Sequence, residues 1–113
     1  MHEISLAGGI LRVLEQTRAR DPFERVKHLR LEAGALCGVE LSALRFALAA
    51  IAPGTCLEGS QIEIDEPAAS AWCMACSQSV EIRSHLDSCP LCGGYQLQAT
   101  SGTELRILDL QVV

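Results

Sequence analysis

Four cysteines form the densest group of metal-binding side chains in the sequence. Cys73 and Cys76 make one C-x-x-C pair, and Cys89 and Cys92 make a second pair after twelve intervening residues. Each pair can present two thiolates to one ion, and together they give the closed tetrahedral shell that is typical of structural zinc. The spacing therefore predicts a four-cysteine Zn(II) site, and a closed shell leaves no coordination position for catalysis.

The residues around the second cysteine pair favour the same interpretation. In "CPLCGG" at 89–94, Pro90 lies inside the pair and two glycines follow it, where the backbone can take positive φ. Segment 68–100 has too few apolar residues to fold alone, and zinc binding contributes about 10–16 kcal/mol in zinc-finger peptides. The alternative is a pair of redox dithiols, but no thioredoxin-like βαβ pattern surrounds these cysteines.

The remaining cysteines and histidines are isolated in the sequence. Cys37 and Cys56 belong to no C-x-x-C pair and are predicted to be buried free thiols. His85 lies between the two cysteine pairs, where it could assist or replace a thiolate or be an exposed loop residue. His2 stands beside the terminal amine, and because termini commonly tolerate change, its position alone does not assign a function.

The apolar pattern predicts the elements that must hold these side chains. Three- and four-residue steps predict a helix over 3–19 and a second helix with an apolar stripe of Leu41, Leu44, Leu48 and Ile51, which ends at Pro53 and Gly54. Alternation predicts strands over 25–33, 61–67 and 103–113, the last of them buried on both faces. The face of the first helix that we expect to be buried carries Ile4, Ala7, Ile10, Leu11 and Leu14.

Composition excludes several classes of protein. With 113 residues and a net charge of −5, the chain is one small domain, or a domain with an appendage, and is not expected to bind nucleic acid non-specifically. The basic residues between Arg18 and Arg30 are either a solvated surface or a local basic patch. No apolar run reaches the roughly 18–20 residues of a membrane span, and no secretory signal opens the chain. We therefore expect a cytoplasmic protein, in which cysteines bind metal rather than form disulfides.

Four short motifs together resemble the HypA/HybF family of hydrogenase nickel-insertion accessory proteins. They are "MHEISL" at the start, "VELSALRFAL" at 39–48, "AWCMACSQSV" at 71–80 and "CPLCGG" at 89–94. The resemblance covers essentially the whole chain. It implies an α+β fold with two parts: a nickel-binding module of two helices on a three-stranded sheet, and an inserted zinc ribbon. On this basis we expect the nickel module at 1–67, continued by the last strand at 100–113, and the ribbon at 68–99.

The resemblance also gives the opening residues a role. The Met1 amine, the His2 backbone nitrogen and the His2 imidazole can close adjacent chelate rings on one ion, and nickel(II) favours such planar nitrogen sites. The family places a further ligand at the backbone nitrogen of Glu3. It also places an acidic residue near the nickel, which Glu40 matches as an outer or weak ligand. The alternative for Glu40 is a solvated residue near a helix start, where negative charge is favoured.

The implied function is delivery of Ni(II) as cargo, with zinc as a structural ion. The resemblance implies a HypB-type GTPase as a partner and the nickel-free large subunit of a [NiFe]-hydrogenase as recipient, and in some bacteria family members also supply urease. No nucleophile–base pair, phosphate-binding loop or open zinc motif predicts an enzyme. Two alternatives stay open from the residues alone: a zinc-ribbon nucleic-acid-binding module that uses the Arg18–Arg30 surface, and a structural interaction protein in which His2 is incidental.

Overall fold

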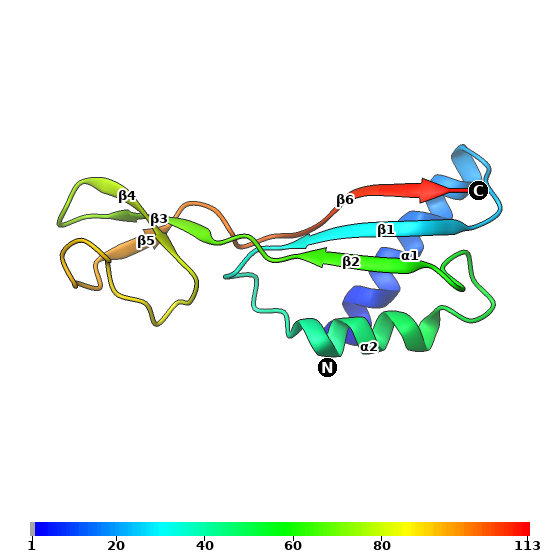
Figure 1. The fold of residues 1–113 in the computed structure, drawn as a ribbon, viewed down its shortest axis with the longest axis horizontal. Coiled ribbons are helices and arrows are strands. Elements are labelled where there is room, and N and C mark those ends of the chain that lie inside the picture. The colour runs from blue at the N-terminus through cyan, green and yellow to red at the C-terminus, as the bar shows by residue number, and fades with distance from the viewer. Residues whose placement is uncertain (1) are drawn as a thin grey trace. The chain divides into compact units, whose positions relative to one another are not determined.

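The computed structural model describes residues 2–113, which form two helices and two three-stranded sheets (Figure 1). The first sheet has the order β2-β1-β6 and the second has the order β4-β3-β5. The predicted α+β class is confirmed. The elements along the chain are α1 (His2–Arg20), β1 (Val26–Ala33), α2 (Leu41–Ile51), β2 (Gln61–Asp65), β3 (Ala69–Cys73), β4 (Gln78–Ile82), β5 (Leu97–Ala99) and β6 (Leu105–Val112).

The chain divides into two compact units. Unit 1 comprises the chain up to Leu31, Val39–Ile64 and Ile107–Val113, and unit 2 comprises Glu32–Gly38 and Asp65–Arg106. Both helices therefore belong to unit 1, whereas β3, β4 and β5 belong to unit 2. Within residues 2–113, no helix combines the length and the apolar character that crossing a membrane requires.

The end of α1 follows from its sequence. Pro22 disfavours a helical conformation in Asp21, so the last helical bond there is the one from the Asp21 N–H to the Thr17 carbonyl, at 2.7 Å. The Arg18 guanidinium then donates to the Phe23 carbonyl at 2.9 Å. This cation lies in the last turn of α1, where positive charge is favoured by the helix dipole.

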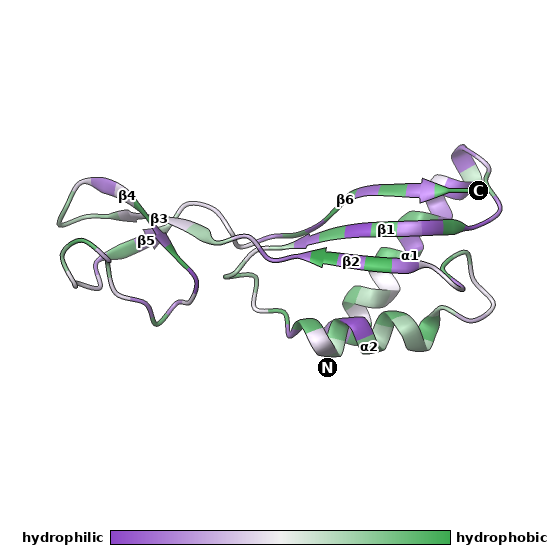
Figure 2. Ribbon diagram, viewed as in Figure 1, coloured by the Kyte–Doolittle hydropathy of each residue, from purple (hydrophilic) through white to green (hydrophobic). Residues whose placement is uncertain are grey.

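The core of unit 1 is aliphatic. Hydrophilic and hydrophobic residues alternate along β1, which lies between β2 and β6 (Figure 2). Its side chains Leu29 and Leu31 are fully buried. Large and small apolar side chains from the two helices and the following loop complete this core: Ala7, Ile10, Leu14, Leu44, Ala47, Leu48 and Leu57.

The sheet of unit 2 was not predicted as strands. In it, β3 pairs antiparallel with both β4 and β5, with Ala71 opposite Val80 and Ala99. These strands have only three to five residues, which is too few for an alternating pattern to stand out from the loop-like composition of this segment. One face of the sheet covers a small core of Leu36, Ala69, Ala71, Cys73, Val80, Ile82 and Cys89.

Two predictions about which helix and strand side chains are buried were wrong. Ile4 is 56% exposed, because the first turn of α1 borders a surface pocket rather than the core. The last strand is not buried on both faces: none of its side chains is fully buried, and Val112 is 44% exposed. The reason is that β6 lies at an edge of the sheet, with a neighbouring strand on one side only.

The two isolated cysteines differ from each other. Cys56 is 2% exposed, as predicted, but Cys37 is only half-buried, because it lies in the turn between β1 and α2, where its N–H donates to the Gly34 carbonyl. Burial and the Glu15 carboxylate raise the pKa of the Cys56 thiol to about 11. Cys56 is therefore a protonated thiol that donates to Glu15 and has no nucleophilic character at neutral pH.

Candidate metal centres

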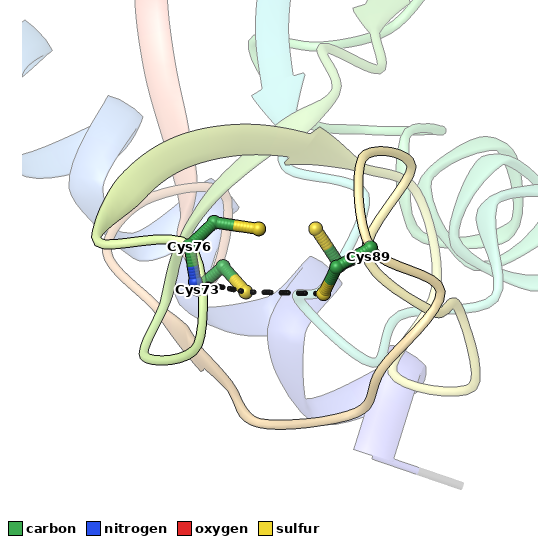
Figure 3. A group of neighbouring side chains, drawn as sticks. Cys73, Cys76 and Cys89 are labelled. Carbon is green, nitrogen blue, oxygen red and sulfur yellow. Dashed lines mark hydrogen bonds between the residues drawn. The ribbon is translucent and has the colours of Figure 1, made fainter.

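The four cysteines of the paired motifs come together in unit 2. Cys73 ends β3, Cys76 lies in the turn before β4, and Cys89 and Cys92 lie in the loop before β5. Their four Sγ atoms all lie within 4.8 Å of one another. Figure 3 shows the side chains of Cys73, Cys76 and Cys89 directed toward a common centre. The spacing that predicted one shared site thus matches the observed arrangement.

The distances fit one tetrahedral ion. Zinc–sulfur bonds of about 2.3 Å place the sulfurs of a tetrahedron about 3.8 Å apart, and the Sγ atoms of Cys73 and Cys92 are 3.7 Å apart. Backbone N–H groups also point at the sulfurs. The N–H of Cys76 donates to Cys73 Sγ and the N–H of Leu91 donates to Cys89 Sγ, both at 3.4 Å. Such donors stabilise the thiolate form of cysteine over the thiol form, and the thiolate is the form that binds a metal.

Both cysteine turns close in the same way. The N–H of Ser77 donates to the Cys73 carbonyl, and the N–H of Gly93 donates to the Cys89 carbonyl, each at 2.8 Å. Ser77 and Gly93 both have positive φ, of 51° and 74°. The glycine was expected from the sequence. The left-handed serine was not, since serine adopts this conformation rarely and only the repeated geometry reveals its role.

Charge explains why these thiols need a cation. The N–H groups of Cys92 and Leu91 lower the pKa of the Cys89 thiol to about 7. The neighbouring thiols of Cys92 and Cys73 raise the pKa of Cys76 to about 12. The Cys76 thiol therefore keeps its proton at neutral pH unless a positive ion sits among the sulfurs. A divalent cation supplies that charge and converts the group into four thiolate ligands.

The other sulfur and imidazole groups lie outside this centre. His85 is exposed and is not part of the one group of metal-binding side chains found among residues 2–113. Cys37 and Cys56 are likewise outside it. Burial is graded within the group, with Cys73 and Cys89 buried and Cys92 exposed. The donor set available in unit 2 is therefore four cysteine sulfurs.

At the start of α1, His2 and Glu3 of the opening motif lie close to each other and to Glu40, the acidic residue that the resemblance places near the nickel. His2 Nδ1 is 3.3 Å from Glu3 Oε2. The same Glu3 oxygen accepts from the backbone N–H of Glu40 at 3.2 Å. Met1 lies outside the described residues. Two segments 37 residues apart are thus joined at the point where the sequence predicted a nickel site.

Glu40 has a local structural role that the sequence suggested only in part. It is the N-cap of α2, and its carboxylate accepts from the N–H of Ala43 at 2.8 Å and from the N–H and hydroxyl of Ser42. These donors, the Ser42 hydroxyl first, lower the pKa of Glu40. The Glu40 N–H is the main cause that lowers the pKa of Glu3. Both carboxylates are therefore negative at neutral pH and are held by backbone donors.

A pocket of about 350 Å³ adjoins these residues. Among its lining side chains, Ile4 and Phe46 are 56% and 77% exposed. The beginning of α1 is therefore reachable from solvent, as a site that exchanges its ligand must be. The lining residues are Glu3, Ile4, Glu40, Ser42, Ala43, Phe46 and Ala47.

Comparison with known proteins gives one consistent result. A family described as "Hydrogenase/urease nickel incorporation, metallochaperone, hypA" matches residues 1–112. The chain is 59% identical over 112 residues to a hydrogenase maturation factor HypA of Polaromonas naphthalenivorans, covering 99% of this chain and 97% of the relative. It is 60% identical over 112 residues to the HypA of Cupriavidus necator, covering 99% and 94%.

Two solved structures share the fold. The solution structure of the Ni metallochaperone HypA from Helicobacter pylori matches with a TM-score of 0.69 at 17% identity, covering all of this chain and 98% of that one. A second solution structure of a HypA protein matches with a TM-score of 0.70 at 20% identity, covering 100% and 97%. At these identities the likeness establishes the fold, whereas the family rests on the sequence matches.

Proposed function

The chain belongs to the HypA family of hydrogenase and urease nickel-incorporation metallochaperones, which are not enzymes, and we propose a function on this basis. We propose that the chain binds nickel(II) at its N-terminus. It then delivers the nickel to the nickel-free large subunit of a [NiFe]-hydrogenase. The proposed ligands are the amine of Met1, the backbone nitrogens of His2 and Glu3, and the His2 imidazole. Glu40 acts as an outer residue that holds Glu3 in place.

The observation that carries this proposal is the position of His2 and Glu3 in the first turn of α1. The first N–H groups of a helix have no intrahelical acceptor, and α1 begins at His2. The backbone nitrogens of His2 and Glu3 are therefore not committed to the helix ladder. The bond from the Glu40 N–H to the Glu3 carboxylate fixes this turn against the start of α2. Nickel(II) can then take planar nitrogen donors from a preformed turn.

For unit 2 we propose a structural zinc ion held by Cys73, Cys76, Cys89 and Cys92. The ion would fix the two cysteine turns against each other and supply the positive charge that the clustered thiolates require. With four sulfurs bound, it keeps no open position for a substrate. We propose that residues 1–67 and 100–113 form the nickel-binding module and that residues 68–99 form the zinc ribbon.

The proposed place of action is the cytoplasm, with a HypB-type GTPase and the nickel-free large subunit as partners. Free thiols persist in that compartment because it is reducing. Maturation of urease is a further use found within the family description. A site at the N-terminus suits transfer because a recipient can replace its ligands one at a time from solvent.

A transfer assay with purified components tests this function. The zinc-loaded chain, charged with one equivalent of nickel, is mixed with a nickel-free large subunit, and nickel in the recipient is measured after separation. We expect transfer from the native chain and its loss in His2→Ala. His85→Ala, which removes an exposed imidazole elsewhere, is the matched control and should transfer normally. Equal transfer by all three proteins would contradict the proposal.

A further inference from the structure

A pocket of about 420 Å³ in unit 1 has a composition opposite to that of the chain as a whole. The chain has 14 acidic and 9 basic residues, but three of the six lining residues of this pocket are Arg25, Lys27 and His28, and none is acidic. The other three are Gly59, Gln61 and Gln111. Cationic and amide donors therefore converge in this pocket, although the chain as a whole is acidic. We call this group of six residues the basic pocket.

The two strongest cations of the basic pocket are available to a ligand. Among the described residues, neither the Arg25 guanidinium nor the Lys27 ammonium has an ion-pair partner, and both residues are exposed. Most of the chain's other cations are already paired. Arg30, for example, contacts Glu63 and Asp109. These two positive charges are therefore free to pair with anions from outside the chain.

The surroundings of the pocket hold its shape. Ser60, beside Gly59, donates its hydroxyl to the Val26 carbonyl, and the Val26 N–H donates to the Cys56 carbonyl at 2.7 Å. His28 is 25% exposed, and its Nε2 lies 3.5 Å from Glu63 Oε2. The Glu63 carboxylate is thus already engaged with His28 and Arg30, and it does not neutralise Arg25 or Lys27.

From this arrangement we propose that the basic pocket binds an acidic segment of a partner protein, with carboxylates at alternate positions of an extended chain. Arg25 and Lys27 are two residues apart at the start of β1, so their backbone positions are about 7 Å apart in an extended chain. Carboxylates two residues apart in an extended partner segment have the same spacing. Gln61 and Gln111 donate to the backbone carbonyls or side chains of that segment.

The chemistry favours carboxylates over phosphate. Phosphate sites in proteins usually combine cations with a helix N-terminus or a nest of backbone N–H groups. No helix begins among the residues that line the basic pocket, and the Arg25 N–H is already committed to the Val113 carbonyl. Separate, exposed cations on a strand suit the dispersed charges of an acidic peptide. The proposal concerns docking only and does not depend on where nickel binds.

Peptide binding to the full zinc-loaded chain tests the proposal. The probe is a short fluorescent peptide in which glutamate alternates with serine, and its control replaces each glutamate with glutamine. We expect anisotropy binding of the acidic peptide only, with amide shifts at Gly59, Gln61 and Gln111 in the NMR spectrum. Binding should weaken with added salt, since it depends on exposed charges.

Charge reversal locates the contact. The double variant Arg25→Glu, Lys27→Glu should bind the peptide about tenfold more weakly or worse. The matched control reverses Arg12 and Arg83, which are also exposed cations without an ion-pair partner among the described residues, and changes the net charge equally. An equal loss in both variants would mean a general charge effect and would overturn the proposal. Peptide binding that leaves the pocket amides unshifted, or pyrophosphate that shifts them when the peptide does not, would also overturn it.

Discussion

Removing the metal should unfold unit 2 and leave unit 1 folded. The fully buried core of unit 2 has three large aliphatic side chains, Leu36, Val80 and Ile82, beside two alanines and two of the cysteines, with the partly buried Leu97 packed against it. Burial of three such side chains contributes about 5–9 kcal/mol. A four-cysteine zinc ion contributes about 10–16 kcal/mol at neutral pH. The ion is therefore the larger stabilising contribution, and the remaining core is too small to hold the sheet without it.

Two optical signals separate the units. Trp72, the single tryptophan of the chain, lies in β3 and reports on unit 2. Helical circular dichroism reports on α1 and α2, which belong to unit 1. With a strong chelator and a thiol reductant, the emission of Trp72, which is 41% exposed in the folded chain, should shift further toward that of a fully solvated indole while the helical signal persists. Restored emission on adding one equivalent of zinc would confirm reversibility.

The same experiment has a matched pair of variants. Cys92→Ser removes one sulfur of the group and should lower the bound zinc and reproduce the emission change of the chelated protein. Cys37→Ser removes a thiol of the same unit that lies outside the group and should keep one zinc per chain. Unchanged Trp72 emission in a preparation shown by elemental analysis to hold no zinc would refute the reasoning. A loss of both optical signals together would refute the independence of unit 1.

Three other predictions concern turns, pH and cargo. Gly102→Ala should destabilise unit 2 by about 2–5 kcal/mol in chemical denaturation, since the new Cβ would lie 2.5 Å from Ala69 Cβ and the backbone φ is +86°. The control Gly38→Ala, with a φ of +73° and open space around it, should lose only the stability that backbone strain costs. Equal losses of stability in the two variants would contradict the steric part of this prediction. The lowered pKa of Glu40 means that its cap stabilises α2 above the ordinary value of 4.5 and is lost as the pH falls through the lowered value. Amide shifts of the first turn of α2 should show this step, and Glu40→Gln should lack it. Nickel affinity should fall between neutral and mildly acidic pH because the amine and the His2 imidazole must release protons to bind; equal calorimetric affinities would contradict the proposed ligands.

Long periodic elements and cysteine spacing were the features that could be predicted from the sequence. The second helix was predicted from its apolar stripe of Leu41, Leu44, Leu48 and Ile51, and the structure forms it over Leu41–Ile51. The strand around Leu29 and Leu31 was predicted from the alternation of apolar and polar residues. This alternation reflects the burial of one face of the strand. The two C-x-x-C pairs predicted one shared group because a metal shell requires its ligands to converge, whatever the fold between them.

Other features depend on contacts between distant segments and leave no local pattern. The bond between Glu3 and Glu40 joins residues 37 apart, and the edge position that exposes β6 depends on strand order. The strands of unit 2 are too short to show periodicity. The left-handed conformation of Ser77 follows from the closure of the cysteine turn rather than from a preference of serine. The Glu3–Glu40 bond and the edge position of β6 follow from tertiary packing, which overrides local propensity.

The most direct test of the account is a calorimetric nickel titration of two zinc-loaded proteins. One is the native chain with a free amine on Met1, and the other carries a single extra residue before Met1. The account predicts tight binding of one nickel ion by the native chain and a large loss of affinity in the extended chain, because the extension displaces the amine from its place beside His2. Equal affinity in the two proteins, or binding by neither, would contradict the claim that this chain carries nickel at its N-terminus.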